Sequence, residues 1–120
     1  MNQIIIDGCV QKDAKLYEEI ANFNISAITG EYTCVDGSKK NRFTYIRVVY
    51  PKPITEYLES VLEPGVMIRI YGKLDSEQYK TASDKIVYNK ILVANKIVKI
   101  KYDKDLKDYV EVVWNEKERS

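Results

Sequence analysis

Residues 66–74 read VMIRIYGKL, and this stretch decides the fold. Successive side chains of a β-strand point to opposite faces, so the alternation predicts a strand with two different sides. One side is apolar and consists of Val66, Ile68, Ile70 and Leu74. The other combines an aromatic ring with two cations, namely Arg69, Tyr71 and Lys73. Such a strand belongs to a sheet that covers a core on one face only.

Two further stretches repeat this alternation. Residues 43–50 read FTYIRVVY and place Tyr45 and Arg47 opposite apolar positions, and residues 87–91 read VYNKI and do the same with Tyr88 and Lys90. A sheet face that mixes rings with cations suits a flexible, unpaired polyanion, because rings stack on bases and cations follow phosphates. The pattern therefore predicts a surface for single-stranded nucleic acid.

The remaining segments complete the expected order of elements. Residues 4–10 and 23–28 read as two earlier strands, with Gly8 marking a bulge or bend, and residues 29–41 read as a polar loop. Apolar residues at helical spacing in 54–62 predict a short helix, with Pro53 in its first turn. The chain thus reads as three strands, a helix and two strands. That is an all-β, five-stranded OB-fold barrel with one short helix between strands 3 and 4.

Composition indicates one globular domain. The chain has 120 residues, of which 45% are hydrophobic and 31% charged. Lys and Arg number 19 and Asp and Glu 18, so nucleic acid would be held by a local basic groove and not by bulk positive charge. No stretch resembles a signal peptide or a membrane span, which predicts a cytoplasmic protein without a membrane partner.

Catalysis is not expected. The chain lacks histidine, and Cys9 and Cys34 match no metal motif, although one disulfide between them stays open. There is no Gly-rich phosphate loop and no pair of carboxylates at a meaningful spacing. We therefore expect neither an enzyme, nor a cofactor, nor a metal site.

Several short stretches together resemble bacterial single-stranded DNA-binding proteins. They run collinearly from residue 2 to about residue 100 and comprise 2–8 (NQIIIDG), 20–25 (IANFNI), 43–49 (FTYIRVV), 56–58 (EYL), 64–66 (PGV) and 70–74 (IYGKL). The resemblance implies an OB-fold that binds single-stranded DNA without sequence preference during replication, recombination or repair. It also implies self-association, as a tetramer of paired dimers or as a dimer.

The resemblance implies stacking roles for three tyrosines. Tyr45 takes the place of the family's third-strand aromatic, Tyr79 that of a hairpin aromatic, and Tyr32 that of one in the loop after the second strand. Arg47 falls where some members are basic. Alternation in this chain adds the remaining candidates, which are Arg69, Tyr71, Lys73, Tyr88 and Lys90.

The last twenty residues differ in character. We expect a DNA-binding domain over 1–100 and a charged segment over 101–120, with an extra strand at 109–114. The family's Gly/Gln-rich linker and acidic tip, which recruits replication and repair enzymes, are missing, and this points to a phage, mobile-element or specialised relative, or to a truncated chain. Two alternatives stay open. One is an accessory protein of replication restart or recombination, and the other is a protein-interaction module that does not bind DNA.

Overall fold

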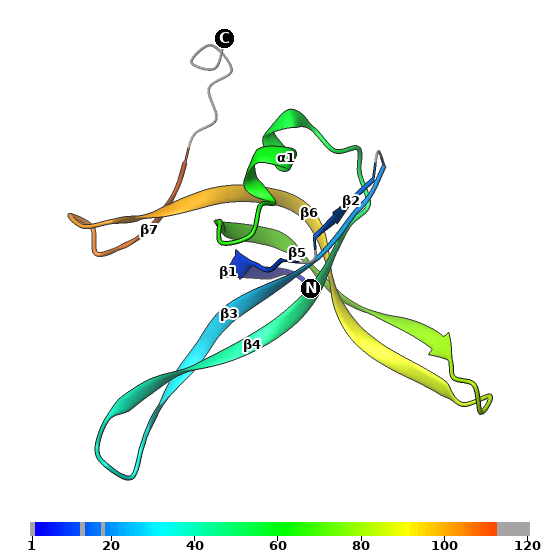
Figure 1. The fold of residues 1–120 in the computed structure, drawn as a ribbon. Coiled ribbons are helices and arrows are strands. Elements are labelled where there is room, and N and C mark those ends of the chain that lie inside the picture. The colour runs from blue at the N-terminus through cyan, green and yellow to red at the C-terminus, as the bar shows by residue number, and fades with distance from the viewer. Residues whose placement is uncertain (1, 13, 18, 113–120) are drawn as a thin grey trace.

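The computed structural model describes residues 2–12, 14–17 and 19–112 of the chain. These residues form seven strands and one short helix, so the protein is mainly β (Figure 1). The elements are β1 (Ile4–Val10), β2 (Lys15–Leu16), β3 (Ala21–Thr33), β4 (Lys39–Tyr50), α1 (Glu56–Val61), β5 (Met67–Lys80), β6 (Ile86–Asp103) and β7 (Asp108–Glu111). The structure thus has two short strands, β2 and β7, besides the five expected for the barrel. β2 was not predicted, whereas β7 overlaps the extra strand expected at 109–114, of which residues 113 and 114 lie outside the described part of the chain.

The five longer strands pair in a ring. β1 pairs with β5, β5 with β6, β6 with β4, β4 with β3, and β3 returns to β1 at Cys9 and Val10. All of these pairings are antiparallel except that of β4 with β6, which is parallel and short. β2 adds to β3, and β7 adds to β6. The helix follows the third of the five long strands, as the sequence predicts.

The inner face of this ring is the core. Alternate residues of β3 are buried from Ala21 through Phe23 and Ile25 to Ala27, as expected for a strand with one covered face. Opposite them, Ile68 and Ile70 of β5 are completely buried. The buried residues that the structure describes are all apolar, so burial of hydrophobic surface holds the ring together.

Helix α1 covers one end of the ring (Figure 1). Leu58 and Val61 are buried in the core, and the hydroxyl of Tyr57 accepts a 2.8 Å hydrogen bond from the backbone N–H of Lys99. Thr55 is the N-cap, its hydroxyl accepting from the N–H of Leu58, so the helix begins after Pro53 and not at it. No helix in the described residues is long and apolar enough to cross a membrane.

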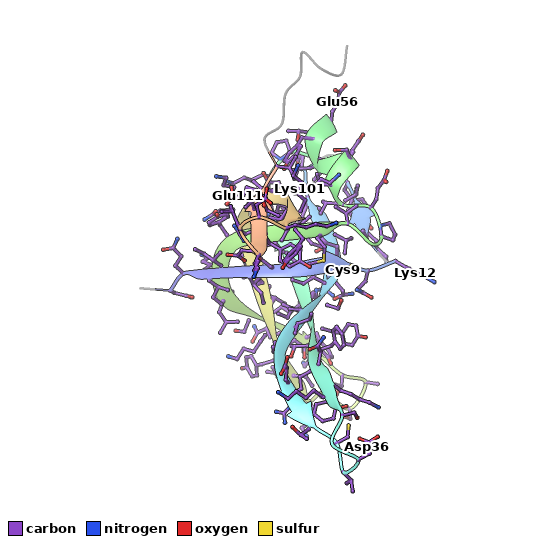
Figure 2. The ribbon with its side chains drawn as sticks, turned by 90° about the vertical axis from the view of Figure 1, so that its left-hand side faces the viewer. Cys9, Lys12, Asp36, Glu56, Lys101 and Glu111 are labelled. Carbon is purple, nitrogen blue, oxygen red and sulfur yellow. The ribbon has the colours of Figure 1, made fainter. Side chains whose placement is uncertain are left out.

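Two long hairpins leave the other end of the ring and diverge (Figure 1). β3 and β4 stay paired out to Thr33 and Lys39, and β5 and β6 to Lys80 and Ile86. Figure 2 shows Asp36, at the tip of the β3–β4 hairpin, at the opposite end of the molecule from Glu56 of α1. The predicted loop over 29–41 is therefore too long, because residues 34–38 form the turn and the residues on either side of them are in strands. Both faces of the hairpin are exposed there, so the sequence carries no apolar alternation although the backbone stays paired.

Gly8 is not at a bulge. β1 pairs with β5 from Ile4 to Cys9 without a register shift, and the shifts fall at Ile28/Gly30 of β3 and at Tyr71/Gly72 of β5. A Cβ at Gly8 would lie 2.9 Å from Cδ1 of Ile25, so the glycine allows β1 to pack closely against β3.

Candidate nucleic-acid interface

Strand β4 presents three side chains in a row on the outside of the ring. Phe43, Tyr45 and Arg47 alternate with the half-buried Ile46 and the buried Val48, so they share the outer face. The side chains of Phe43 and Tyr45 are 57% and 72% exposed. Adjacent members of this row, called here the β4 stripe, are about 6.8 Å apart along the strand. Two solvated rings beside a cation form a platform on which bases can stack.

The neighbouring strand leaves this platform open. β3 places Ser26 directly opposite Tyr45, and Asn24 directly opposite Arg47. Residues directly opposite each other in an antiparallel pair lie on the same face. Because Ser26 is small, one side of the Tyr45 ring stays accessible to a ligand.

Arg47 is held by an ion pair that solvent can reach. Its Nε lies 3.2 Å from Oε1 of Glu77 on β5, and the two side chains are 51% and 32% exposed. Exposed ion pairs contribute little to stability and exchange partners readily. The guanidinium is therefore oriented on the outer face and can still bind a phosphate.

A cleft of about 290 Å³ lies where the two hairpins leave the ring. Its apolar lining includes Ile4 and Ile6 of β1 and Leu74 of β5, and its aromatic and charged lining consists of Tyr45, Arg47 and Lys90. We call it the inter-hairpin cleft. Three of the residues singled out from the sequence therefore line one cleft, although they are up to 45 positions apart.

The β5–β6 hairpin divides its candidate residues between two faces. Lys73, Glu77 and the exposed Tyr79 are separated by even numbers of positions in β5, so they lie on the same face. Glu77 pairs with Arg47, which identifies this face as the outer one. Tyr88 pairs with Gln78, and Lys90 with Ser76, which places both on the opposite face of the hairpin. The sequence pattern does not distinguish these faces, because it does not show how the two strands are paired.

Tyr32 lies on a different face from the β4 stripe. Its partner across the hairpin is Lys40. Lys40 is an odd number of positions from Phe43 and Tyr45 in β4, so Lys40 and Tyr32 lie on the opposite face of the hairpin from those two rings. The cause is the register shift between Ile28 and Gly30, which adds one residue to β3 and turns every later side chain to the other side. Tyr32 is exposed but does not extend the row of Tyr45.

Arg69 and Tyr71 are engaged by carboxylates of the protein itself. Arg69 donates hydrogen bonds of 2.7 and 3.0 Å to the two carboxylate oxygens of Asp7, and its Nη1 lies 3.5 Å from Oε2 of Glu111. The Tyr71 hydroxyl donates to the same Glu111 oxygen. The hydrogen bond with Asp7 raises the pKa of Arg69 above its ordinary value. These contacts join β1, β5 and β7.

The hydrogen bond between Tyr71 and Glu111 shifts both groups. It raises the pKa of the Tyr71 hydroxyl, which must keep its proton to donate, and it lowers the pKa of the Glu111 carboxyl, because the ionised carboxylate is the form that accepts this hydrogen bond. The Nζ of Lys96 lies 5.2 Å from the centroid of the Tyr71 ring, and its positive charge also helps to lower the pKa of Glu111. Arg69 and Tyr71 therefore hold β7 on the sheet, and in this arrangement their polar groups face protein partners.

Comparisons with known proteins add information at the level of structure. Neither the protein-family models nor the curated proteins give a match to this sequence. The SSB protein of Plasmodium falciparum, solved in complex with single-stranded DNA, matches with a TM-score of 0.63 at 17% identity, over 94% of this chain and 96% of that one. The small single-stranded DNA-binding protein of Streptomyces coelicolor matches with a TM-score of 0.62 at 12% identity, over 87% and 95%. This chain shares their fold.

The structure adds one residue to the candidates, Phe43. It lies two positions before Tyr45 on the same exposed face, and this spacing in the sequence was the signal that could have found it.

Among the described residues, no group of three or more His, Cys, Asp or Glu side chains is arranged to hold a metal ion. Cys9 and Cys34 are both free thiols.

Proposed function

We propose that this protein binds single-stranded DNA with little sequence preference, using an OB-fold barrel formed by the ring of β1, β3, β4, β6 and β5. The observation that carries the proposal is the β4 stripe, in which two exposed rings and a cation follow one another at the edge of the inter-hairpin cleft. The shared fold supports it, because one protein of this fold was solved in complex with single-stranded DNA.

Binding would rest mainly on stacking. Two bases stack on Phe43 and Tyr45, and Arg47 contacts the phosphate backbone beside them on the outer face. Lys90 contacts the backbone where the strand crosses the inter-hairpin cleft. Each stacked base contributes about 1–3 kcal/mol, so two or three rings provide useful affinity even in a chain with a net charge of only +1. Because rings stack on any base, this mode has little sequence preference, and it weakens less with salt than one built on phosphate contacts alone.

The rest of the binding surface follows the hairpins. Tyr79 and Lys73 extend it over the outer face of β5, and Tyr88 and Tyr32 offer rings on the faces that the β4 stripe does not reach. Arg69 and Tyr71 would contribute only after release from Asp7 and Glu111. Residues 1–100 would form the binding domain and 101–120 a charged segment. Its role would be to protect transient single strands during replication, recombination or repair in the cytoplasm, beside other proteins of those processes.

We also propose that the protein self-associates as a dimer or tetramer. Strand β1 pairs with β5 along Ile4–Cys9 but with β3 only at Cys9 and Val10 among the described residues, so much of its second edge is free. Ile5 on this strand is exposed. An unpaired edge with an exposed apolar side chain is a ready site for another chain. Sizing coupled to light scattering tests this, and a monomer at micromolar concentration would contradict it.

The decisive experiment for DNA binding measures the anisotropy of labelled oligo-dT, next to matched duplex and RNA, at low and moderate salt. Tyr45→Ala should weaken oligo-dT binding roughly 5- to 150-fold, the loss of one stacked base. Tyr102→Ala is the matched control, because Tyr102 is 53% exposed but lies on the hairpin of β6 and β7. Absence of binding by the wild-type protein at low salt would refute the proposal.

A further inference from the structure

A second hollow lies on the outer face of β2, β3 and β4, beside the β4 stripe. Its volume is about 260 Å³, slightly below the ~300 Å³ at which small-molecule pockets begin, so it can hold about one nucleotide unit. We call it the β2 hollow, and its lining residues are Lys15, Tyr17, Asn22, Phe23, Asn24 and Arg47.

Strand pairing fixes the positions of the charged groups in this hollow. Lys15 of β2 lies directly opposite Asn22 of β3, and Arg47 of β4 lies directly opposite Asn24 of β3. Residues directly opposite each other share a face. The hollow therefore has a cation on either side and two amide side chains between them.

Tyr17 supplies an aromatic ring at the end of β2. Its side chain is 55% exposed, and its backbone N–H donates a 2.8 Å hydrogen bond to the carbonyl of Ile20. That bond closes the turn between β2 and β3 and fixes the backbone from which the ring extends. An exposed ring on a fixed backbone can stack on a base at little cost in chain entropy.

The charge of the hollow favours an anion. Its lining includes two cations, Lys15 and Arg47, of which Arg47 is in an exposed ion pair with Glu77, and none of the lining residues that the structure describes is a carboxylate. An amide side chain such as that of Asn22 can both donate to and accept from the edge of a base. A nucleotide can therefore stack the face of its base on the ring, form hydrogen bonds from the edge of its base to an amide, and place its phosphate near the cations.

We propose that the β2 hollow binds a further nucleotide of the same single strand, with its base on Tyr17 and its phosphate between Lys15 and Arg47. This inference rests on the proposed function. Arg47 lines both the β2 hollow and the inter-hairpin cleft, so a strand that leaves the β4 stripe at Arg47 enters the hollow directly. The hollow thus lengthens the binding path across β3 toward β2.

Oligonucleotide length separates the two parts of this path. Anisotropy titrations would use labelled oligo-dT of about 4 and about 16 nucleotides, the limits of the site size of OB folds. Tyr17→Ala and Lys15→Gln should each weaken the long oligonucleotide about tenfold and the short one less than about twofold, since the β4 stripe holds the short one. Tyr102→Ala and Lys101→Gln are the matched controls, because both residues are exposed and lie on β6 next to β7.

The outcomes distinguish this inference from the proposed function. If Tyr45→Ala weakens binding while Tyr17→Ala and Lys15→Gln match wild type with the long oligonucleotide, the β2 hollow is refuted and DNA binding stands. If wild type binds neither oligonucleotide, both are refuted. Photocrosslinking of 5-iodouracil-substituted oligo-dT gives a readout independent of affinity. A crosslinked peptide containing Tyr17 supports the hollow, and crosslinks confined to residues 39–50 overturn it.

Discussion

The Nε of Arg47 lies 3.2 Å from Oε1 of Glu77, and this ion pair joins β4 to β5 on the outside of the ring. The two strands are not neighbours, because β6 lies between them. The cation of the β4 stripe is therefore paired with a carboxylate while no DNA is bound. A phosphate that binds Arg47 has to compete with that carboxylate.

Replacing Glu77 by glutamine should tighten binding to single-stranded DNA. The change removes the competitor for Arg47 and one negative charge from the outer face, and an exposed pair of this kind is worth about 0.2–1 kcal/mol. We expect up to about fivefold higher affinity for oligo-dT at low salt, with the gain decreasing as salt screens the charges. Glu59→Gln on α1 is the control, since it makes the same charge change near the other end of the ring. Equal gains in both variants would show that only net charge matters.

The two phenylalanines should behave in opposite ways when each is replaced by alanine. Phe43 is exposed on the β4 stripe, so Phe43→Ala should weaken oligo-dT binding roughly 5- to 150-fold and leave the free energy of unfolding nearly unchanged. Phe23 is buried, so Phe23→Ala should lower the free energy of unfolding by about 3–5 kcal/mol. Denaturant titration and anisotropy measure the two quantities. A destabilised Phe43→Ala with normal binding would make that ring structural.

The sequence predicts strands well where one face is buried and poorly where neither is. Residues 66–74 alternate because Ile68 and Ile70 enter the core, and the corresponding strand is present. Beyond Leu74, which is exposed, β5 continues to Lys80 through polar residues. Its backbone stays paired with β6 there, but no burial imposes a pattern on the side chains. The alternation therefore stops at Leu74 although the strand does not, and residues 29–33 read as a loop for the same reason.

The candidate site shows a similar limit. The shared outer face of Tyr45 and Arg47 follows from alternation, because Val48 on the other face is buried. The face of Tyr32 depends on one extra residue in β3, and a bulge leaves little mark on a single sequence. The engagement of Arg69 depends on Asp7, 62 positions away. Contacts over such separations are a property of the fold and are not contained in local spacing.

Gly72 should tolerate no side chain, whereas Gly30 should accept one. Both glycines lie at register shifts, but a Cβ at Gly72 would collide with the backbone carbonyl of Val93, and a Cβ at Gly30 would meet nothing within 4 Å. A side chain at Gly72 would push β5 and β6 apart. Overpacking a protein core lowers the free energy of unfolding by about 1–3 kcal/mol, and we expect a similar loss here. Gly72→Ala should therefore lower the denaturation midpoint clearly, and Gly30→Ala should leave it near wild type. Equal midpoints for the two variants would contradict the close approach seen at Gly72.

The docking of β7 on the sheet should depend on pH through Glu111. The hydrogen bond from Tyr71, with Lys96 and Arg69 nearby, lowers the pKa of this carboxyl below its ordinary 4.5. A carboxyl whose pKa is lowered by folding stabilises the folded form above its unfolded pKa, and that contribution is lost as pH falls through the folded pKa. Hydrogen-exchange protection of the Val112 N–H, which donates to the Lys99 carbonyl, should therefore be constant above pH 4.5 and decrease below it. Glu111→Gln cannot ionise, so its protection should be lower at neutral pH and nearly independent of pH. If that variant lost protection below pH 4.5 as steeply as wild type, another group would control the docking of β7.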